Sequence, residues 1–139
     1  MPYDLEINQG GTFTLTLIWQ DSNKTAIDIS GRSARMHIRA THSSPVVLVE
    51  LTSDNNRITL GGATGTILLT LTAEETSLID WTFAVYDLEL FYDDSGTEIV
   101  DKIIGGNITV VQEVTKGQVS TELTAITYLT SNTTMEVFG

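Results

Sequence analysis

The segment Thr12–Trp19 alternates threonine, at positions 12, 14 and 16, with the apolar residues Phe13, Leu15 and Leu17. A period of two residues is typical of a β-strand that buries one face and exposes the other. Ser33–Arg39 repeats the pattern, since Ala34, Met36 and Ile38 point one way while Arg35, His37 and Arg39 point the other. No long segment has a helical period, so the alternation predicts an all-β chain.

Further short β-prone runs follow at close intervals, separated by polar or glycine-rich turns. These runs are Val46–Leu51, Arg57–Leu60, Thr66–Leu71, Trp81–Tyr92, Glu98–Ile104 and Asn107–Val111. Gly61–Gly65 and Asp93–Gly96 are predicted turns, and Gly105–Gly106 is predicted as a turn or bulge. We therefore predict an antiparallel β-sandwich, Ig-like or jelly-roll-like in type.

One short helix is expected inside this β-rich chain. Thr72 is followed three residues later by Glu75, which is the spacing of a capping box. In that motif the threonine and glutamate side chains satisfy backbone donors of the first helical turn. We expect one helical turn that begins there and ends near Asp80.

The length of 139 residues suits one domain, and a domain of this size needs no covalent staple. The chain contains no cysteine, which fits folding in a reducing cytosol. A compositional break at Lys116–Gly117 divides the sequence into a predicted sandwich, residues 1–116, and a C-terminal arm, residues 117–139. The acidic start carries no signal-peptide pattern, and no apolar run is long enough to cross a membrane.

The net charge of −11 argues against nucleic acid and against anionic membrane surfaces as partners. Only seven residues are Lys or Arg, and three of them are Arg32, Arg35 and Arg39. We take Arg35 and Arg39 as candidates for contact with an acidic partner surface. The alternative is that they pair across strands with acidic residues of the same chain.

The sequence offers no recognisable catalytic constellation, so we predict that the chain is not an enzyme and binds no cofactor. The only histidines, His37 and His42, are expected at the surface and lack the spacing of a metal site. Asp87 and Glu89 are expected on a solvated sheet face and not as a glycosidase pair. No acidic loop has the spacing of a calcium-binding EF-hand, and Gly61–Gly65 lacks the Lys-Ser/Thr of a phosphate loop.

The C-terminal arm is poor in charge and rich in threonine, apolar and aromatic residues, which is the opposite of a disordered tail. An extended apolar arm needs a sheet to pair with, either on a neighbouring subunit or on its own domain. Both possibilities stay open from the sequence. The candidate partner-contact residues in the arm are Leu123, Ile126, Tyr128, Leu129, Val137 and Phe138.

The order and spacing of several motifs resemble those of small virion proteins of tailed bacteriophages. The motifs are Gln9-Gly10-Gly11-Thr12-Phe13, Asp28-Ile29-Ser30-Gly31 and Tyr86-Asp87-Leu88-Glu89. The resemblance covers roughly residues 4–115. Over this range the chain is similar to tail, baseplate and tail-fibre-adaptor subunits and to N-terminal domains of baseplate upper proteins. It implies a structural subunit without catalytic residues.

From this resemblance we expect a virion component made in the host cytoplasm. It would contact other virion proteins and copies of itself as a homo-oligomer within a larger assembly. The alternative functions are capsid decoration and a carbohydrate-binding module at the host surface. Carbohydrate modules usually expose several aromatic side chains on one face, whereas the aromatic residues here mostly occupy predicted core positions.

Overall fold

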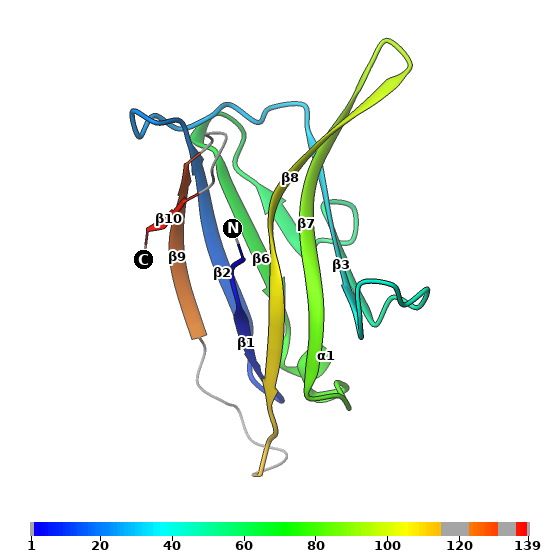
Figure 1. Cartoon of the computed structure of the whole chain (residues 1–139). Coiled ribbons are helices and arrows are strands. Elements are labelled where there is room, and N and C mark those ends of the chain that lie inside the picture. The colour runs from blue at the N-terminus through cyan, green and yellow to red at the C-terminus, as the bar shows by residue number, and fades with distance from the viewer. Residues whose placement is uncertain (1, 115–122, 131–135, 139) are drawn as a thin grey trace.

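Two five-stranded sheets face each other in the computed structural model, which describes residues 2–114, 123–130 and 136–138 (Figure 1). The first sheet has the strand order β1-β8-β7-β3-β4, and the second has the order β10-β9-β2-β6-β5. The strands of the first sheet are β1 (Leu5–Asn8), β8 (Thr97–Val111), β7 (Phe83–Asp94), β3 (Ser33–Arg39) and β4 (Val49–Thr52). Those of the second are β10 (Glu136–Phe138), β9 (Leu123–Thr130), β2 (Phe13–Gln20), β6 (Thr66–Leu71) and β5 (Ile58–Leu60). The predicted all-β sandwich is confirmed.

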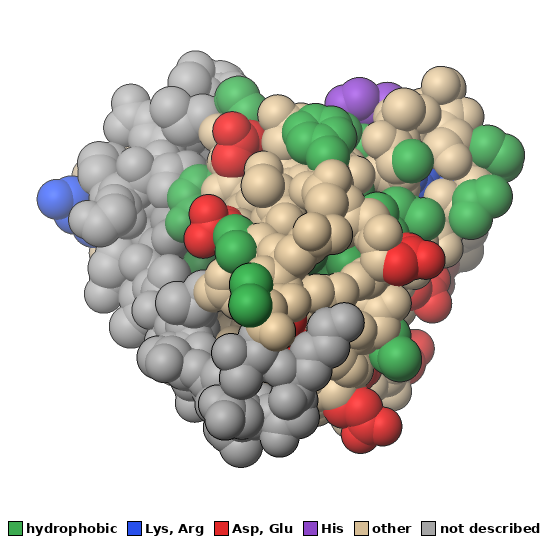
Figure 2. Space-filling model, turned by 90° about the horizontal axis from the view of Figure 1, so that it is seen from below, with side chains coloured by type: hydrophobic (Ala, Val, Ile, Leu, Met, Phe, Trp, Pro, Cys, Tyr) green, Lys and Arg blue, Asp and Glu red, His purple; other side chains and the backbone are tan. Residues whose placement is uncertain are grey.

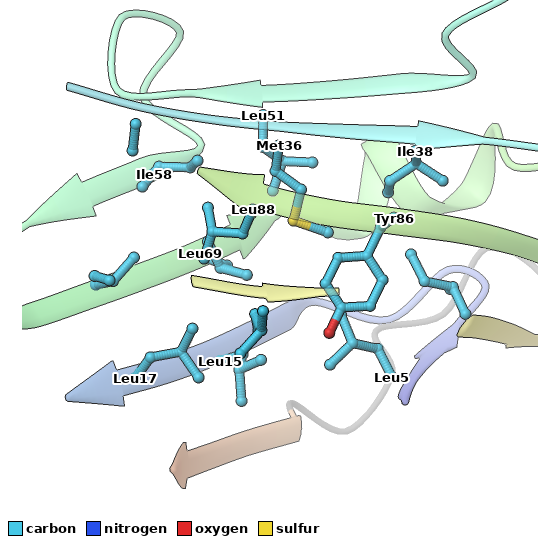
Figure 3. Packing of buried hydrophobic residues seen from close by; sticks show 14 of the residues in the cluster. Leu5, Leu15, Leu17, Met36, Ile38, Leu51, Ile58, Leu69, Tyr86 and Leu88 are labelled. Atoms are coloured by element: carbon cyan, nitrogen blue, oxygen red, sulfur yellow. The ribbon is translucent and has the colours of Figure 1, made fainter. Parts of the chain in front are cut away.

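The hydrophobic core lies between the sheets, where the inward positions of the strands meet (Figure 3). Burial alternates along β2 and β3 as the period of two predicts. Twelve large side chains are almost fully buried: Ile7, Leu17, Ile29, Met36, Ile38, Leu51, Ile58, Ile67, Leu69, Leu71, Leu88 and Leu90. Burying one such side chain contributes about 1.5–3 kcal/mol, so interdigitated aliphatic residues supply most of the driving force.

The helical elements are short. The helix α1 (Ala73–Ser77) begins at Thr72 with the predicted capping box. The Glu75 backbone N–H donates to Thr72 Oγ1 at 3.1 Å, and the Thr72 N–H donates to Glu75 Oε1 at 2.8 Å. A single 3-10 turn, η1 (Gly62–Thr64), lies inside the predicted glycine-rich turn. No helix among the described residues is long and apolar enough to cross a membrane.

Two differences from the predicted strands are larger than a shift of one or two residues at an end. The run predicted from Val46 forms a strand only from Val49, and Val46 is 60% exposed. The two runs on either side of Gly105–Gly106 form the single strand β8, with a bulge at Ile103 where the register against β7 shifts. A Cβ on Gly106 would lie 2.5 Å from the Tyr3 carbonyl oxygen, so glycine here permits a close approach of the N-terminal segment.

Two neighbouring pairs are parallel, although antiparallel sheets were predicted. β1 runs parallel to β8, with Leu5 opposite Ile108, and β2 runs parallel to β9, with Phe13 opposite Leu123. The remaining strand pairs are antiparallel. Each parallel pair joins elements far apart in the sequence, and alternation of side chains carries no information about strand direction.

The segment predicted as a C-terminal arm contributes two strands to the second sheet of its own chain. β9 pairs with β2 over eight residues, from Phe13–Leu123 to Gln20–Thr130. β10 then pairs with β9 in the antiparallel direction. Of the two docking modes left open by the sequence, the single chain therefore adopts pairing with its own domain.

The β7–β8 hairpin projects beyond the rest of the sandwich (Figure 1). β3 accompanies β7 only as far as the pair Ser33–Phe91, so the two strands continue as an isolated ribbon. The predicted turn closes this ribbon, with positive φ angles of 53° at Ser95 and 90° at Gly96. The ribbon places acidic residues at a tip well away from the core.

Candidate interaction surface

The outward face of the first sheet carries the basic residues singled out by the sequence. Arg35 on β3 lies opposite Glu89 on β7, and its Nε donates to Glu89 Oε1 at 2.9 Å. Its Nη1 also donates to Glu98 Oε1 at 2.9 Å, and the guanidinium stacks 4.3 Å from the centre of the Phe91 ring. The hydrogen bond to Glu89, with the negative charge of Glu98 close by, raises the pKa of Arg35 above its usual value. Arg35 thus makes the cross-strand pairs that were the alternative to partner contact.

Arg39 lies at the other end of the same strand and belongs to a different network. Its Nη1 donates to the Ser44 carbonyl oxygen at 3.0 Å, and its Nη2 lies 3.3 Å from His37 Nδ1. His37 Nε2 in turn lies 3.0 Å from Glu50 Oε2 on β4. The strands thereby hold Arg39 against the loop that follows β3. Its contact with a partner stays a prediction.

Both histidines line one open cavity beside Arg39, together with Asp87 and Glu89. Among the described residues, no group of three or more His, Asp or Glu side chains could hold a metal ion. That neither histidine binds a metal stays a prediction. Asp87 and Glu89 are half-buried on the sheet face. Glu89 forms an ion pair with Arg35, and Lys102 Nζ lies 3.9 Å from Asp87 Oδ2. These groups form a charged sheet surface bound together by internal pairs.

Two arginines brace the projecting hairpin from opposite faces. Phe91 and Tyr92 are consecutive residues of β7 and therefore point to opposite sides of the ribbon. Arg35 stacks on Phe91, whereas Arg32 stacks 4.9 Å from the Tyr92 ring centre and forms an ion pair with Asp101. Cation–π contacts and ion pairs on both faces stiffen a two-stranded ribbon that would be marginal by itself. The sequence placed Arg32 among the basic residues but could not show that it faces Asp101, 69 residues away.

The motif Gln9-Gly10-Gly11 ties three segments together at the opposite end of the sandwich. The Gln9 side chain donates to the Ile79 carbonyl oxygen at 2.7 Å and accepts from the Glu113 backbone N–H at 2.8 Å. Thr76 of α1 is fully buried and donates its hydroxyl to the Gly11 carbonyl oxygen at 2.8 Å. The motif therefore fixes the β1–β2 corner to α1 and to the end of β8.

The region of the third motif, Tyr86-Asp87-Leu88-Glu89, joins the N-terminal segment to the sheet. The hydroxyl of buried Tyr86 donates to the Tyr3 carbonyl oxygen, and the Asn107 backbone N–H donates to Asp4 Oδ1 at 3.1 Å. In the second motif, Asp28-Ile29-Ser30-Gly31, the Ser30 N–H donates to Asp28 Oδ1 at 2.9 Å, ahead of Gly31 with a φ of 78°. Hydrogen bonds from Ser30 lower the pKa of the exposed Asp28 carboxyl group. All these motif residues stabilise corners and turns of the framework.

Hydrophobic side chains are also exposed at the end of the molecule where α1 lies (Figure 2). Figure 2 shows them as separate groups among polar atoms. Four of the large exposed apolar residues belong to segments at this end: Leu78, Phe83, Val111 and Val114. Val114 is 95% exposed and is the last described residue before the C-terminal strands. Apolar side chains scattered singly are normal at a protein surface, so these residues do not by themselves mark a contact surface.

The remaining candidate contact residues lie on β9 and β10. The structure describes the backbone of these strands, while the side chains fall outside its described part. Partner contact by them stays a prediction. The residues concerned are Leu123, Ile126, Tyr128 and Leu129 on β9 and Val137 and Phe138 on β10.

No protein-family model matches the chain, and a search of curated proteins also gives no match.

Proposed function

We propose that this chain is a structural subunit of a tailed-bacteriophage virion, in the tail, baseplate or fibre-attachment region, and that it acts through protein–protein contacts. The observation that supports this proposal is that residues of the motifs form hydrogen bonds that hold the elements of the fold together. Gln9 binds the segments that directly follow α1 and β8, Tyr86 joins β7 to the N-terminal segment, and Asp28 shapes a turn. The motifs that resemble those of phage subunits thus form part of a rigid framework in this chain.

The framework leaves several elements for contacts with other subunits. β4, β1, β5 and β10 lie at the edges of their sheets, where backbone groups can pair with another chain. The hairpin tip presents the exposed acidic residues Asp93, Asp94 and Glu98, with Arg32 and Arg35 holding its base. A stiff projecting element loses little conformational entropy on binding, which favours its use as a docking element.

Mass spectrometry and antibody labelling of purified particles test the proposal. Phage particles are purified and searched by mass spectrometry for peptides of this chain. An antiserum against the recombinant chain is then used for immunogold labelling. We expect the chain in stoichiometric amounts and the label confined to the tail or its tip. Absence of the chain from intact particles would refute the proposal, and label over the capsid would favour capsid decoration.

The carbohydrate-binding alternative has one specific observation in its favour. Tyr92 lines an open cavity with Arg32, Asp28 and Asp93, a combination of aromatic and charged groups found where proteins bind sugars. Only one aromatic residue lines that cavity, and Arg32 already stacks on its ring. Titration with host surface polysaccharide separates the two functions. Saturable binding that is lost in Tyr92→Ala would support the alternative, and the absence of binding would remove it.

A further inference from the structure

The pairing of β9 with β2 connects the C-terminal segment to the sandwich through a strand edge. β2 pairs with β6 on one side and with β9 on the other. Without β9, the eight residues of β2 would present an unpaired edge. Long unpaired edges recruit further strands, and natural proteins normally cover them or place charges along them. β9 is the cover that this chain provides.

The chain between β8 and β9 is longer than this connection requires. Val111 at the end of β8 lies opposite Asn8, and Leu123 at the start of β9 lies opposite Phe13. Asn8 and Phe13 are joined by only five residue steps, so the two connected ends are at most about 28 Å apart, counting about 5 Å for each strand pair. The segment from Val111 to Leu123 has about twelve steps and can reach about 40 Å.

The sequence composition of this seam suits contact between copies of a strongly acidic chain. β2 and β9 contain no charged residue, although the whole chain carries a net charge of −11. Three of the four edge strands, β1, β4 and β10, each carry a glutamate, which discourages pairing between identical chains, whereas the short edge strand β5 carries no charge. The β2–β9 seam lacks that protection, so two copies can approach there without bringing carboxylates together.

We infer that β9 is an exchangeable strand, which pairs with β2 of a second copy when subunits are packed closely. The acceptor edge in a second copy is identical, so the exchanged strand makes the same backbone hydrogen bonds in the same register, Phe13 opposite Leu123 through Gln20 opposite Thr130. The balance between the two arrangements then depends on the local concentration of subunits. This inference rests on the proposed function in one respect only, namely that an assembly supplies the close packing.

Engineered cysteines can detect the exchange because the natural chain has none. Thr16 lies opposite Ile126, and neighbouring strands are about 4.8 Å apart, which is within the Cα separation that a disulfide spans. Full-length Thr16→Cys and Ile126→Cys chains with different tags are unfolded, refolded together at increasing concentration, and oxidised. The matched control replaces Thr16→Cys by Thr109→Cys, at an exposed position on the other sheet.

We expect a mixed disulfide that rises with concentration and exceeds the control pair several-fold. The double variant Thr16→Cys/Ile126→Cys, oxidised when dilute, should close within one chain and verify the geometry. If the double variant closes while the mixed pair never exceeds the control, β9 does not exchange and the inference is wrong. If neither this pair nor Ile18→Cys/Tyr128→Cys closes in any arrangement, the register itself is wrong and the inference falls with it.

The outcome is distinguishable from a failure of the proposed function. Particles that contain the chain, together with a purified chain that does not exchange β9, would retain the virion role and remove the strand exchange. Exchange by the purified chain without any presence in particles would do the reverse.

Discussion

Replacing Gly106 by alanine tests whether the N-terminal segment is held against β8 as the structure shows. A Cβ at this position would lie 2.5 Å from the Tyr3 carbonyl oxygen and 2.9 Å from its carbonyl carbon, whereas ordinary contacts begin near 3.4 Å. The Tyr3 backbone must therefore move by about 1 Å, since β8 is fixed between β1 and β7. That movement disturbs the hydrogen bond from Tyr3 N–H to the Gly105 carbonyl oxygen, 2.9 Å long, and the one from Tyr86.

The expected loss in the free energy of unfolding is about 2–4 kcal/mol, from overpacking of about 1–3 kcal/mol and one or two weakened hydrogen bonds. Gly105→Ala is the matched control, because its Cβ would come no closer than 3.1 Å to another atom. Both variants change glycine to alanine in the same strand, so their effects on the unfolded chain cancel in the comparison. We expect Gly105→Ala to cost at most about 1.5 kcal/mol.

Urea denaturation followed by tryptophan fluorescence measures both variants, since Trp19 is buried in the core. The midpoint should fall clearly further for Gly106→Ala than for Gly105→Ala, with similar slopes. Equal stability of the two variants would show that the N-terminal segment does not lie against Gly106, and the reasoning would be refuted.

Four further substitutions probe other contacts. Burial raises the pKa of Tyr86 above its usual value of 10.0, so the unfolded chain ionises first and the wild type should lose stability as pH rises above about 10. Tyr86→Phe should lower the free energy of unfolding by about 1 kcal/mol at pH 7 and should remove the loss of stability above about pH 10 that comes from this tyrosine. Urea midpoints of the wild type and the variant that change in parallel from pH 7 to 11 would contradict this prediction. Thr72→Ala removes the hydrogen bond from the Glu75 backbone N–H to Thr72 Oγ1 and should cost about 1 kcal/mol in thermal or urea unfolding, while an unchanged midpoint would argue against the cap. Arg35→Gln should lower stability by up to about 1 kcal/mol, since its pairs are partly screened by solvent, and Arg39→Gln should lower it less. A larger loss for Arg39→Gln would show that the two networks have been ranked wrongly.

The sequence by itself determined the local features of this protein. The alternation in Phe13–Gln20 and Ser33–Arg39 fixed which side chains face the core, because successive residues of a strand point to opposite faces. The spacing of Thr72 and Glu75 fixed the start of α1, and Asp93–Gly96 fixed the hairpin turn. Each of these signals depends on residues only a few positions apart.

The tertiary structure decided which strands become neighbours and which charges meet. Arg35 could equally have faced a partner, and only the register of β3 against β7 brings it to Glu89. Gly105–Gly106 indicated a turn or a bulge in sequence, yet these residues continue β8, and Tyr3 of the N-terminal segment packs against Gly106. The parallel pairing of β9 with β2 likewise joins residues more than a hundred positions apart. Such contacts depend on how the whole chain closes its core, and a local pattern specifies the face of a strand without specifying its neighbour.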